Sequence, residues 1–213
     1  MTLPASGVIS FGDINTELGL SATATLGLGD AAPRHLAGVA SGAISTSDFY
    51  SKTFYARAST SAEIASDGSY SNPTNAYDQD TAITEDTSTY ATVSKPPSGT
   101  YPGTETVRFS GFGSGTRTGY VRIYFYASVT DTGADPGTTS SAYIEVNGNN
   151  IYQLDSLGTG GTWTQGPTSV STGSASYNLA TLYVDFTCMG GRQSLGDQAS
   201  AVFNVFDIRF ILS

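Results

Sequence analysis

The residue types that most often carry catalysis are scarce in this chain of 213 residues, which contains one histidine and one cysteine. His35 follows Arg34, and no Ser or acidic residue stands at a spacing typical of a nucleophile–base pair. Cys188 stands in an apolar stretch, which favours a small buried side chain over an activated thiolate. We therefore expect a chain that is not an enzyme.

Clustered carboxylates offer two further kinds of site chemistry. Asp78 and Asp80 lie in one polar stretch, and oxygen ligands gathered in a loop suit Ca²⁺. Ala82 occupies the third ligand position of an EF-hand loop, so the EF-hand spacing fails and metal binding is disfavoured. Glu85 and Asp86 would suit a glycoside hydrolase only if the fold set two carboxylates across a cleft. We expect no cofactor, with a structural Ca²⁺ as the alternative.

Aromatic side chains are the best candidates for binding. Trp163 is the one tryptophan, and Tyr124, Tyr126 and Tyr143 stand at outward positions of expected strands. An aromatic ring offers a flat apolar surface on which a sugar ring stacks or a neighbouring subunit packs. Three interpretations remain open for these residues: ordinary outward side chains of a sheet, a subunit interface, or a glycan site.

A series of short strands must position these aromatic residues. Residues 120–129 alternate in polarity, which places Phe125 in a core and Tyr124 on the outer face. A second alternating segment places Val184 inward and Tyr183 outward. Alternation with a period of two predicts strands that bury one face.

The remaining strands and turns complete an antiparallel pattern. Asn147–Asn150 separates two alternating segments, which is a strong hairpin signal. Residues 201–212 are almost wholly apolar, as in a central strand, and residues 189–191 predict a turn. Short strands without a long helical pattern predict an all-β domain over residues 54–213, an antiparallel jelly-roll sandwich.

The start of the chain follows a different pattern, because one phrase occurs in it twice. Ser-Gly-x-Ile-Ser-x-x-Asp, followed by an apolar residue, begins at Ser6 and again at Ser41. In each copy a Ser and an acid three positions later form a capping-box pattern. The pattern predicts short helices after Ser10 and Ser45, the first over residues 11–18.

Residues 1–53, the N-terminal arm, contain too little apolar sequence for a core of their own, since helices this short are marginal in water. We expect the arm to bury its apolar side chains on another surface: the chain's own sandwich, sister copies or a different protein. The expected docking residues are Ile9, Phe11, Ile14, Leu18, Leu36, Ile44, Phe49 and Tyr50.

The N-terminal arm resembles the N-terminal module of tailed-bacteriophage structural proteins. The shared phrases are I-S-x-x-D-I-x-x-E-L-G-L, carried by residues 9–20, and D-A-A-x-R-x-L-A-G-V-x-S-G-A-I-S-x-S-D-F-Y, carried by residues 30–50. Pro33, Ser51 and Thr53 depart from the usual residues. The resemblance implies a virion component, made in a bacterial host cytoplasm, whose partners are other virion proteins and sister copies.

A second resemblance concerns the β-rich part. Residues 75–81 and 89–92 are similar to the opening of galactose-binding or discoidin-like jelly rolls, whose phrase is A-x-D-G-x-x-x-T-x-W. Gln79 stands where that family has Gly, and Tyr90 where it has Trp. The resemblance implies a β-sandwich in which Asp78 holds a loop.

Composition excludes other classes of partner. Lys and Arg total 9 against 18 Asp and Glu, so the net charge is −9, and 13% of residues are charged. A basic surface for nucleic acid or an anionic membrane is therefore not expected. No segment has the apolar length of a membrane span, and the N-terminus lacks the pattern of a secretory signal.

The function that we expect is that of a non-enzymatic bacteriophage virion protein, docked by its arm on the tail, baseplate, neck or head surface. The alternative is a lectin-like carbohydrate-binding protein for host attachment, with a host surface glycan as its partner. A glycan depolymerase is the third interpretation.

Overall fold

The computed structural model describes residues 3–39, 41–52, 54–66, 68–71, 91–97, 103–132, 140–156, 160–192 and 198–212. The calcium candidates Asp78 and Asp80, the carboxylate pair at 85–86 and most of the galactose-binding-like phrase lie outside these ranges. Within them, no helix is long and apolar enough to cross a membrane.

Both capping boxes predicted from the repeated phrase are present in the N-terminal arm. Ser10 Oγ accepts from Asp13 N at 3.1 Å, and the Asp13 carboxylate accepts from Ser10 N at 2.8 Å. In the second copy, Ser45 N donates to the Asp48 carboxylate at 2.7 Å. The helical elements are α1 (Phe11–Glu17), α2 (Ala31–Ala37) and the 3₁₀ turn η1 (Thr46–Phe49).

The N-terminal arm has a small hydrophobic core of its own, which corrects the expectation drawn from its composition. The buried members are Leu3, Ile9, Ile14, Leu18, Leu36, Ala37 and Phe49, with Ile44 and Tyr50 partly buried beside them. Five of the eight expected docking residues are therefore buried inside the arm, whereas Phe11 is 53% exposed. Burial of this apolar surface does not require a partner.

Long-range hydrogen bonds explain how so short a segment encloses a core. Leu3 N donates to Lys52 O at 2.9 Å, and the Tyr50 hydroxyl donates to Gly7 O at 2.6 Å. The guanidinium of Arg34 donates to three carbonyl groups of neighbouring loops. These bonds bring the two ends of the arm together, so that its apolar side chains pack on one another.

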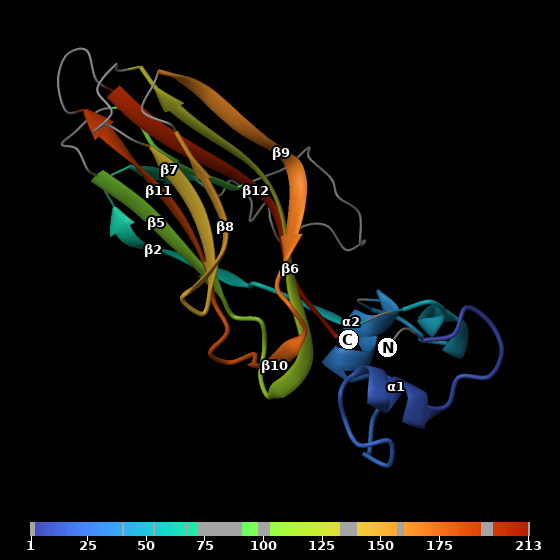
Figure 1. Cartoon of the computed structure of the whole chain (residues 1–213). Coiled ribbons are helices and arrows are strands. Elements are labelled where there is room, and N and C mark those ends of the chain that lie inside the picture. Colours follow the sequence, from blue (N-terminus) through green and yellow to red (C-terminus); the bar gives the residue numbers. More distant parts are fainter. Residues whose placement is uncertain are drawn as a thin grey trace.

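The rest of the chain forms a β-sandwich of two antiparallel layers (Figure 1). The strands are β1 (Tyr55–Arg57), β2 (Thr60–Ser66), β3 (Ser69–Ser71), β4 (Ala91–Lys95), β5 (Gly103–Ser110), β6 (Thr116–Asp131), β7 (Ser141–Val146), β8 (Asn149–Asp155), β9 (Gly161–Ser171), β10 (Ala175–Asn178), β11 (Val184–Arg192) and β12 (Gln198–Leu212).

The β12 layer has the order β4-β12-β6-β9, with β3 beside β4, β1 beside β12 and β10 beside β6. The β11 layer has the order β2-β5-β11-β7-β8. The pair Gly191–Ala199 joins β11 to β12 and so connects the layers. Most successive strands lie in opposite layers, as the jelly-roll prediction requires.

The core lies between the two layers, and the predicted alternation is confirmed. Phe125 and Val184 are 0% exposed, whereas Tyr124 and Tyr183 remain partly exposed. Because antiparallel partners in register share a face, the alternation of β6 and β11 also sets which residues of their neighbours point outward.

The N-terminal arm lies at one end of the sandwich (Figure 1). Phe54 packs against both hydrophobic cores, and its backbone N donates to Glu17 Oε1 at 2.8 Å. Leu212, at the end of β12, donates to Phe54 O at 3.5 Å. Gly19 has φ +68°, and a Cβ there would lie 2.7 Å from Arg117 Cδ, so glycine permits the close approach.

Candidate functional site

The side chains suited to catalysis do not gather in the part of the chain that the structure describes. Cys188 is 0% exposed, and its thiol donates to Val93 O at 3.3 Å. Burial raises the pKa of the Cys188 thiol, which disfavours the reactive thiolate. Among the described residues, no three His, Cys, Asp or Glu side chains form a group that could hold a metal. The side chain of His35, in α2, lies outside the described part.

The four aromatic candidates occupy three different surfaces. Trp163 pairs with Val129, whose side chain faces the core, and Trp163 itself packs against that core. Tyr124 and Tyr126 lie on the outer face of the β12 layer, and Tyr143 lies on the outer face of the β11 layer. The four residues therefore do not form one site.

Tyr143 lies within a polar surface of the β11 layer, which we call the outer polar face. Directly opposite residues of antiparallel strands point the same way, so alternate rows of pairs across β5, β11, β7 and β8 point outward and make up this face. Its three rows are Arg108–Asp185–Glu145–Asn150, Thr106–Thr187–Tyr143–Gln153 and Thr104–Met189–Ser141–Asp155. Tyr143 remains partly exposed in the middle row, whereas Thr106 and Thr187 beside it are buried.

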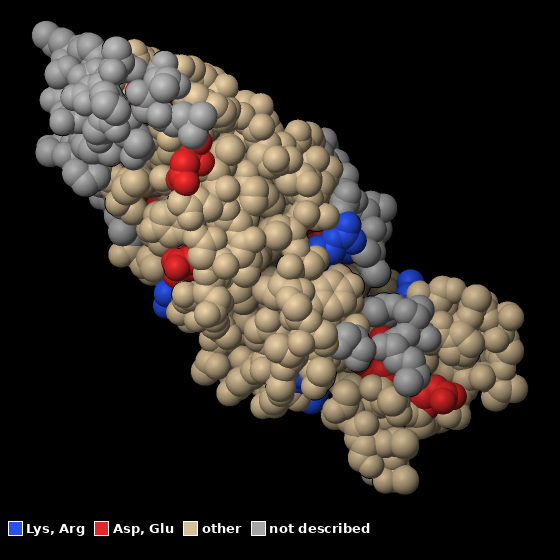
Figure 2. Space-filling view, viewed as in Figure 1, with Lys and Arg blue, Asp and Glu red and all other residues tan. Residues whose placement is uncertain are grey.

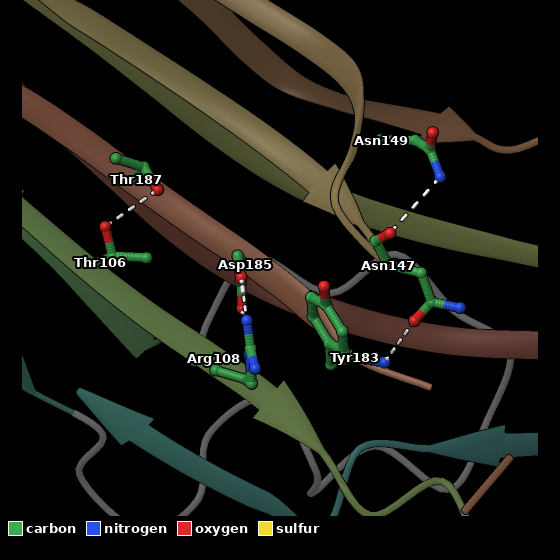
Figure 3. Close-up of polar contacts among 7 residues, drawn as sticks. All are labelled: Thr106, Arg108, Asn147, Asn149, Tyr183, Asp185 and Thr187. Atoms are coloured by element: carbon green, nitrogen blue, oxygen red, sulfur yellow. Dashed lines mark hydrogen bonds and ion pairs between the residues drawn. The ribbon is translucent and has the colours of Figure 1, made fainter. Parts of the chain in front are cut away.

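Hydrogen bonds between neighbours hold several side chains of the outer polar face. The hydroxyl oxygens of Thr106 and Thr187 lie 3.1 Å apart (Figure 3). Asp155 accepts from Gln153 Nε2 at 2.7 Å and from Ser141 Oγ at 2.5 Å. Side chains that are already held in place lose little conformational entropy when a ligand binds.

Arg108 and Asp185 form a bidentate ion pair on the outer polar face (Figure 3). Arg108 Nε and Nη2 donate to the two carboxylate oxygens at 2.8 and 2.7 Å. The hydrogen bonds to Asp185 raise the pKa of Arg108, and Arg108 Cζ lies 3.7 Å from the centroid of the Tyr183 ring. Since Asp185 neutralises Arg108, Glu145 and Asp155 leave the outer polar face with a net negative charge.

The turn between β7 and β8 adds amide groups beside this ion pair. Asn147 and Gly148 have φ +50° and +77°, as in a two-residue type I′ turn. The turn is shorter than the predicted four-residue connection because β8 already begins at Asn149. Asn147 Oδ1 accepts from Tyr183 N at 3.1 Å (Figure 3). The Asn147 side-chain NH₂ has no hydrogen-bond partner among the described residues.

A hollow of about 560 Å³ lies at the edge of the sandwich, between this turn and the connection from β9 to β10. We call it the edge hollow; its lining includes Val146, Asn147, Asn149, Ile151, Ser171 and Tyr177. The lining residues that the structure describes combine amide and hydroxyl groups with apolar side chains, and none of them is charged.

The side of the edge hollow that carries Tyr177 is held in place by contacts with the sandwich. Thr172 Oγ1 accepts from Val121 N at 2.9 Å and from the Tyr177 hydroxyl at 3.0 Å. The Tyr177 ring meets Phe210 edge to face, with centroids 5.8 Å apart. These contacts fix the position at which Tyr177 faces the hollow.

Neither the edge hollow nor the Arg108–Asp185 pair could be predicted from the sequence. Arg108 and Asp185 stand at outward positions of alternating strands, so their sequence pattern resembles that of ordinary solvated residues. The hollow has no signal in the sequence, because Asn147 and Ser171 approach each other only through the fold.

No family model and no curated protein matches this chain. Among solved structures, dimeric latent PorU from Porphyromonas gingivalis aligns at a TM-score of 0.32 with 14% identity, over 57% of this chain and 11% of that one. The CBM36-1 domain of a multidomain xylanase from the hindgut metagenome of Trinervitermes trinervoides aligns at 0.28 with 8% identity, over 74% and 94%. CBM28, a carbohydrate-binding module specific for non-crystalline cellulose, aligns at 0.31 with 12% identity, over 57% and 74%.

Proposed function

We propose that this chain is a non-enzymatic carbohydrate-binding protein whose sandwich contacts glycan through the outer polar face. The observation that supports this function best is the placement of Tyr143 among polar side chains that hydrogen bonds already hold. Sugars present both hydroxyl groups and apolar ring faces, so they suit fixed polar groups beside a partly exposed aromatic ring. The strands of the β11 layer supply this rigid support.

The charge of the surface favours an uncharged polysaccharide. The outer polar face carries a net negative charge, and the whole chain has a net charge of −9. Figure 2 shows a largely uncharged surface in that view, with few and scattered charged side chains. An anionic polysaccharide would be repelled, whereas a neutral one would meet hydroxyl, amide and carboxylate acceptors. A single site of this kind binds at about millimolar concentration, and several copies would multiply the avidity.

A glycan array probed with the intact chain tests the function. Tyr143→Ala is expected to weaken the best uncharged glycan about tenfold, which corresponds to the loss of one aromatic contact. Tyr126→Ala is the matched control, since Tyr126 is also partly exposed but lies on the outer face of the other layer. Equal losses in both variants contradict the assignment to this face. Absence of binding to every uncharged glycan contradicts the function, and shortening of a bound polysaccharide contradicts its non-enzymatic part.

We also propose that the N-terminal arm anchors the protein in a bacteriophage particle, with other virion proteins and sister copies as partners. The arm encloses its own core and yet leaves Val8 92% and Phe11 53% exposed. Phe11 lies within the first capping box and within the phrase that resembles the phage module, and Val8 directly precedes that phrase. A partner that covered them would remove this apolar surface from water.

Incorporation into particles tests the anchoring role. The double variant Val8→Asp, Phe11→Asp is expected to fold but to reach purified particles at a reduced copy number. Thr23→Asp, an exposed position elsewhere in the arm, adds a carboxylate without touching the apolar pair and controls for charge. Normal incorporation of the double variant would show that these two residues do not dock the protein.

A further inference from the structure

We propose that the edge hollow is a second ligand site and that it takes one uncharged sugar ring. The inference rests on the proposed carbohydrate-binding function, but it concerns a different part of the sandwich from the outer polar face. The volume of about 560 Å³ falls within the range of small-molecule sites. Its floor and rim supply the two kinds of contact that a sugar ring requires.

The rim offers hydrogen-bonding groups that the protein does not use itself. Asn147 NH₂, Asn149 Oδ1 and the Ser171 hydroxyl have no hydrogen-bond partner among the residues that the structure describes. The Asn147 NH₂ group is a donor, Asn149 Oδ1 is an acceptor, and the Ser171 hydroxyl can act as both. Adjacent sugar hydroxyls, which both donate and accept, complement this set.

The floor offers an apolar surface of fixed shape. Val146 and Ile151 come from β7 and β8, and the Tyr177 ring comes from β10 on the opposite layer. Because Thr172 and Phe210 hold Tyr177 in place, the hollow does not depend on a ligand to form it. The C–H face of a pyranose packs on such a surface while its hydroxyls reach the rim.

The absence of charge among the described lining residues sets the ligand class. A carboxylate or phosphate placed here would lose water without gaining an ionic partner, which is costly. A neutral sugar also loses bound water here, but the amide and hydroxyl groups of the rim replace the hydrogen bonds to that water. The hollow therefore selects a neutral ring over a uronic acid or a sugar phosphate.

The orientation of Asn147 is set by contacts outside the hollow. Tyr183 N donates to Asn147 Oδ1, so the carbonyl oxygen is occupied and the NH₂ group is left for a ligand (Figure 3). Arg108 stacks on the Tyr183 ring and is itself held by Asp185. Asn147 is thus a contact residue whose orientation is set by the backbone of Tyr183.

Asn147→Asp tests the site with the smallest change, because it keeps the oxygen that accepts from Tyr183 and replaces the free donor. Asn178→Asp is the matched control: Asn178 Oδ1 also accepts a backbone N–H, from Ala180 at 3.1 Å, and Asn178 is not among the lining residues. The probes are D-glucose, D-galactose and N-acetyl-D-glucosamine, with D-glucuronate as the anionic probe. Saturation-transfer and titration NMR on the intact chain measure binding.

We expect at least one neutral probe to bind at about millimolar concentration and D-glucuronate not to bind. Asn147→Asp is expected to weaken the neutral probe about five- to tenfold, and Asn178→Asp to leave it unchanged. Gly173→Phe provides a second variant, because a Cβ at Gly173 meets nothing within 4 Å and a bulky ring would fill the hollow. This variant is expected to abolish binding.

The outcomes separate this inference from the function on which it rests. If no free sugar binds, or if binding survives both hollow variants, while a polysaccharide still binds through Tyr143, the inference is overturned and the proposed function stands. If neither free sugars nor polysaccharides bind, both are overturned.

Discussion

The N-terminal arm and the sandwich bury their apolar residues by different means. The sandwich encloses a large core between two layers whose backbone groups pair in ladders. The arm encloses a small core with short helical turns, and individual side chains such as Arg34 and Tyr50 make the connecting hydrogen bonds. Stability in the sandwich is therefore spread over much area, whereas in the arm it depends on a few links.

Truncation of one core residue in each region should separate them most clearly. Phe49→Ala and Phe125→Ala each remove a ring that is 0% exposed, at a cost of about 3–5 kcal/mol. That cost approaches the whole stability of a unit as small as the arm, so Phe49→Ala should unfold the arm and leave the sandwich transition in place. Phe125→Ala should lower the sandwich transition. Calorimetry with hydrogen exchange checks both, and an equal loss across the chain in both variants would contradict the comparison.

The next largest effect should come from breaking the contact between the arm and the sandwich. Glu17 is 2% exposed and its Oε1 accepts from Phe54 N, where the arm meets β1. Glu17→Ala leaves this partly buried N–H without its acceptor, and we expect a loss of about 1–3 kcal/mol. Glu17→Gln keeps an acceptor oxygen and serves as the control. Faster hydrogen exchange at Phe54 in Glu17→Ala alone would support the contact, whereas unchanged exchange would contradict it.

A smaller loss of stability is expected in the sandwich at alkaline pH. The Tyr152 hydroxyl is buried without a hydrogen-bond partner among the described residues, and burial raises the pKa of Tyr152 to about 12. Since the unfolded chain ionises this group near pH ~10, the sandwich should lose stability as pH rises from about 10 to 12. Tyr152→Phe should remove that loss and add about 1 kcal/mol at neutral pH.

Thermal melts at neutral and alkaline pH measure this effect, with Tyr177→Phe as the matched control. The Tyr177 hydroxyl donates to Thr172, so removing it should cost stability and not add it. A stabilising Tyr177→Phe, or a destabilising Tyr152→Phe, would contradict the assigned environments of the two hydroxyls.

The smallest effect should be a loss of stability of the arm at acid pH. The Ser10 side chain and backbone lower the pKa of Asp13, and the Ser45 backbone and side chain lower the pKa of Asp48. Their contribution is complete above the ordinary carboxyl value of about 4 and is lost as pH falls through the lowered native values. Hydrogen exchange between pH ~5 and ~2 should show the arm opening before the sandwich. Asp13→Asn should reduce this dependence, and an unchanged profile would contradict it.

The sequence predicts local features of both regions well, because local geometry determines them. The Ser10–Asp13 capping box and the inward position of Phe125 follow from spacings of three and two residues. The core of the arm was not predictable in this way, since it depends on contacts such as Leu3 with Lys52 that join its two ends.

The turn predicted at residues 189–191 is wrong for a related reason. β11 continues through Gly190 and Gly191 to residue 192 and pairs with β12 there. A Cβ at Gly190 would lie 2.5 Å from Ala199 O, so the glycine serves a close approach of two strands and not a reversal of the chain. The partner strand that creates this need is invisible in the local sequence.

The Asn147–Gly148 turn makes the protein prone to slow deamidation at one position. An asparagine followed by glycine is the sequence most open to deamidation, because the glycine lacks a Cβ that would hinder attack by its backbone nitrogen on the side-chain carbonyl. Asn147 and Gly148 are both exposed, and the hydrogen bond from Tyr183 N restrains the Asn147 carbonyl. Stored protein would accumulate aspartate or isoaspartate at this one rim position of the edge hollow, so its neutral rim would become anionic with time.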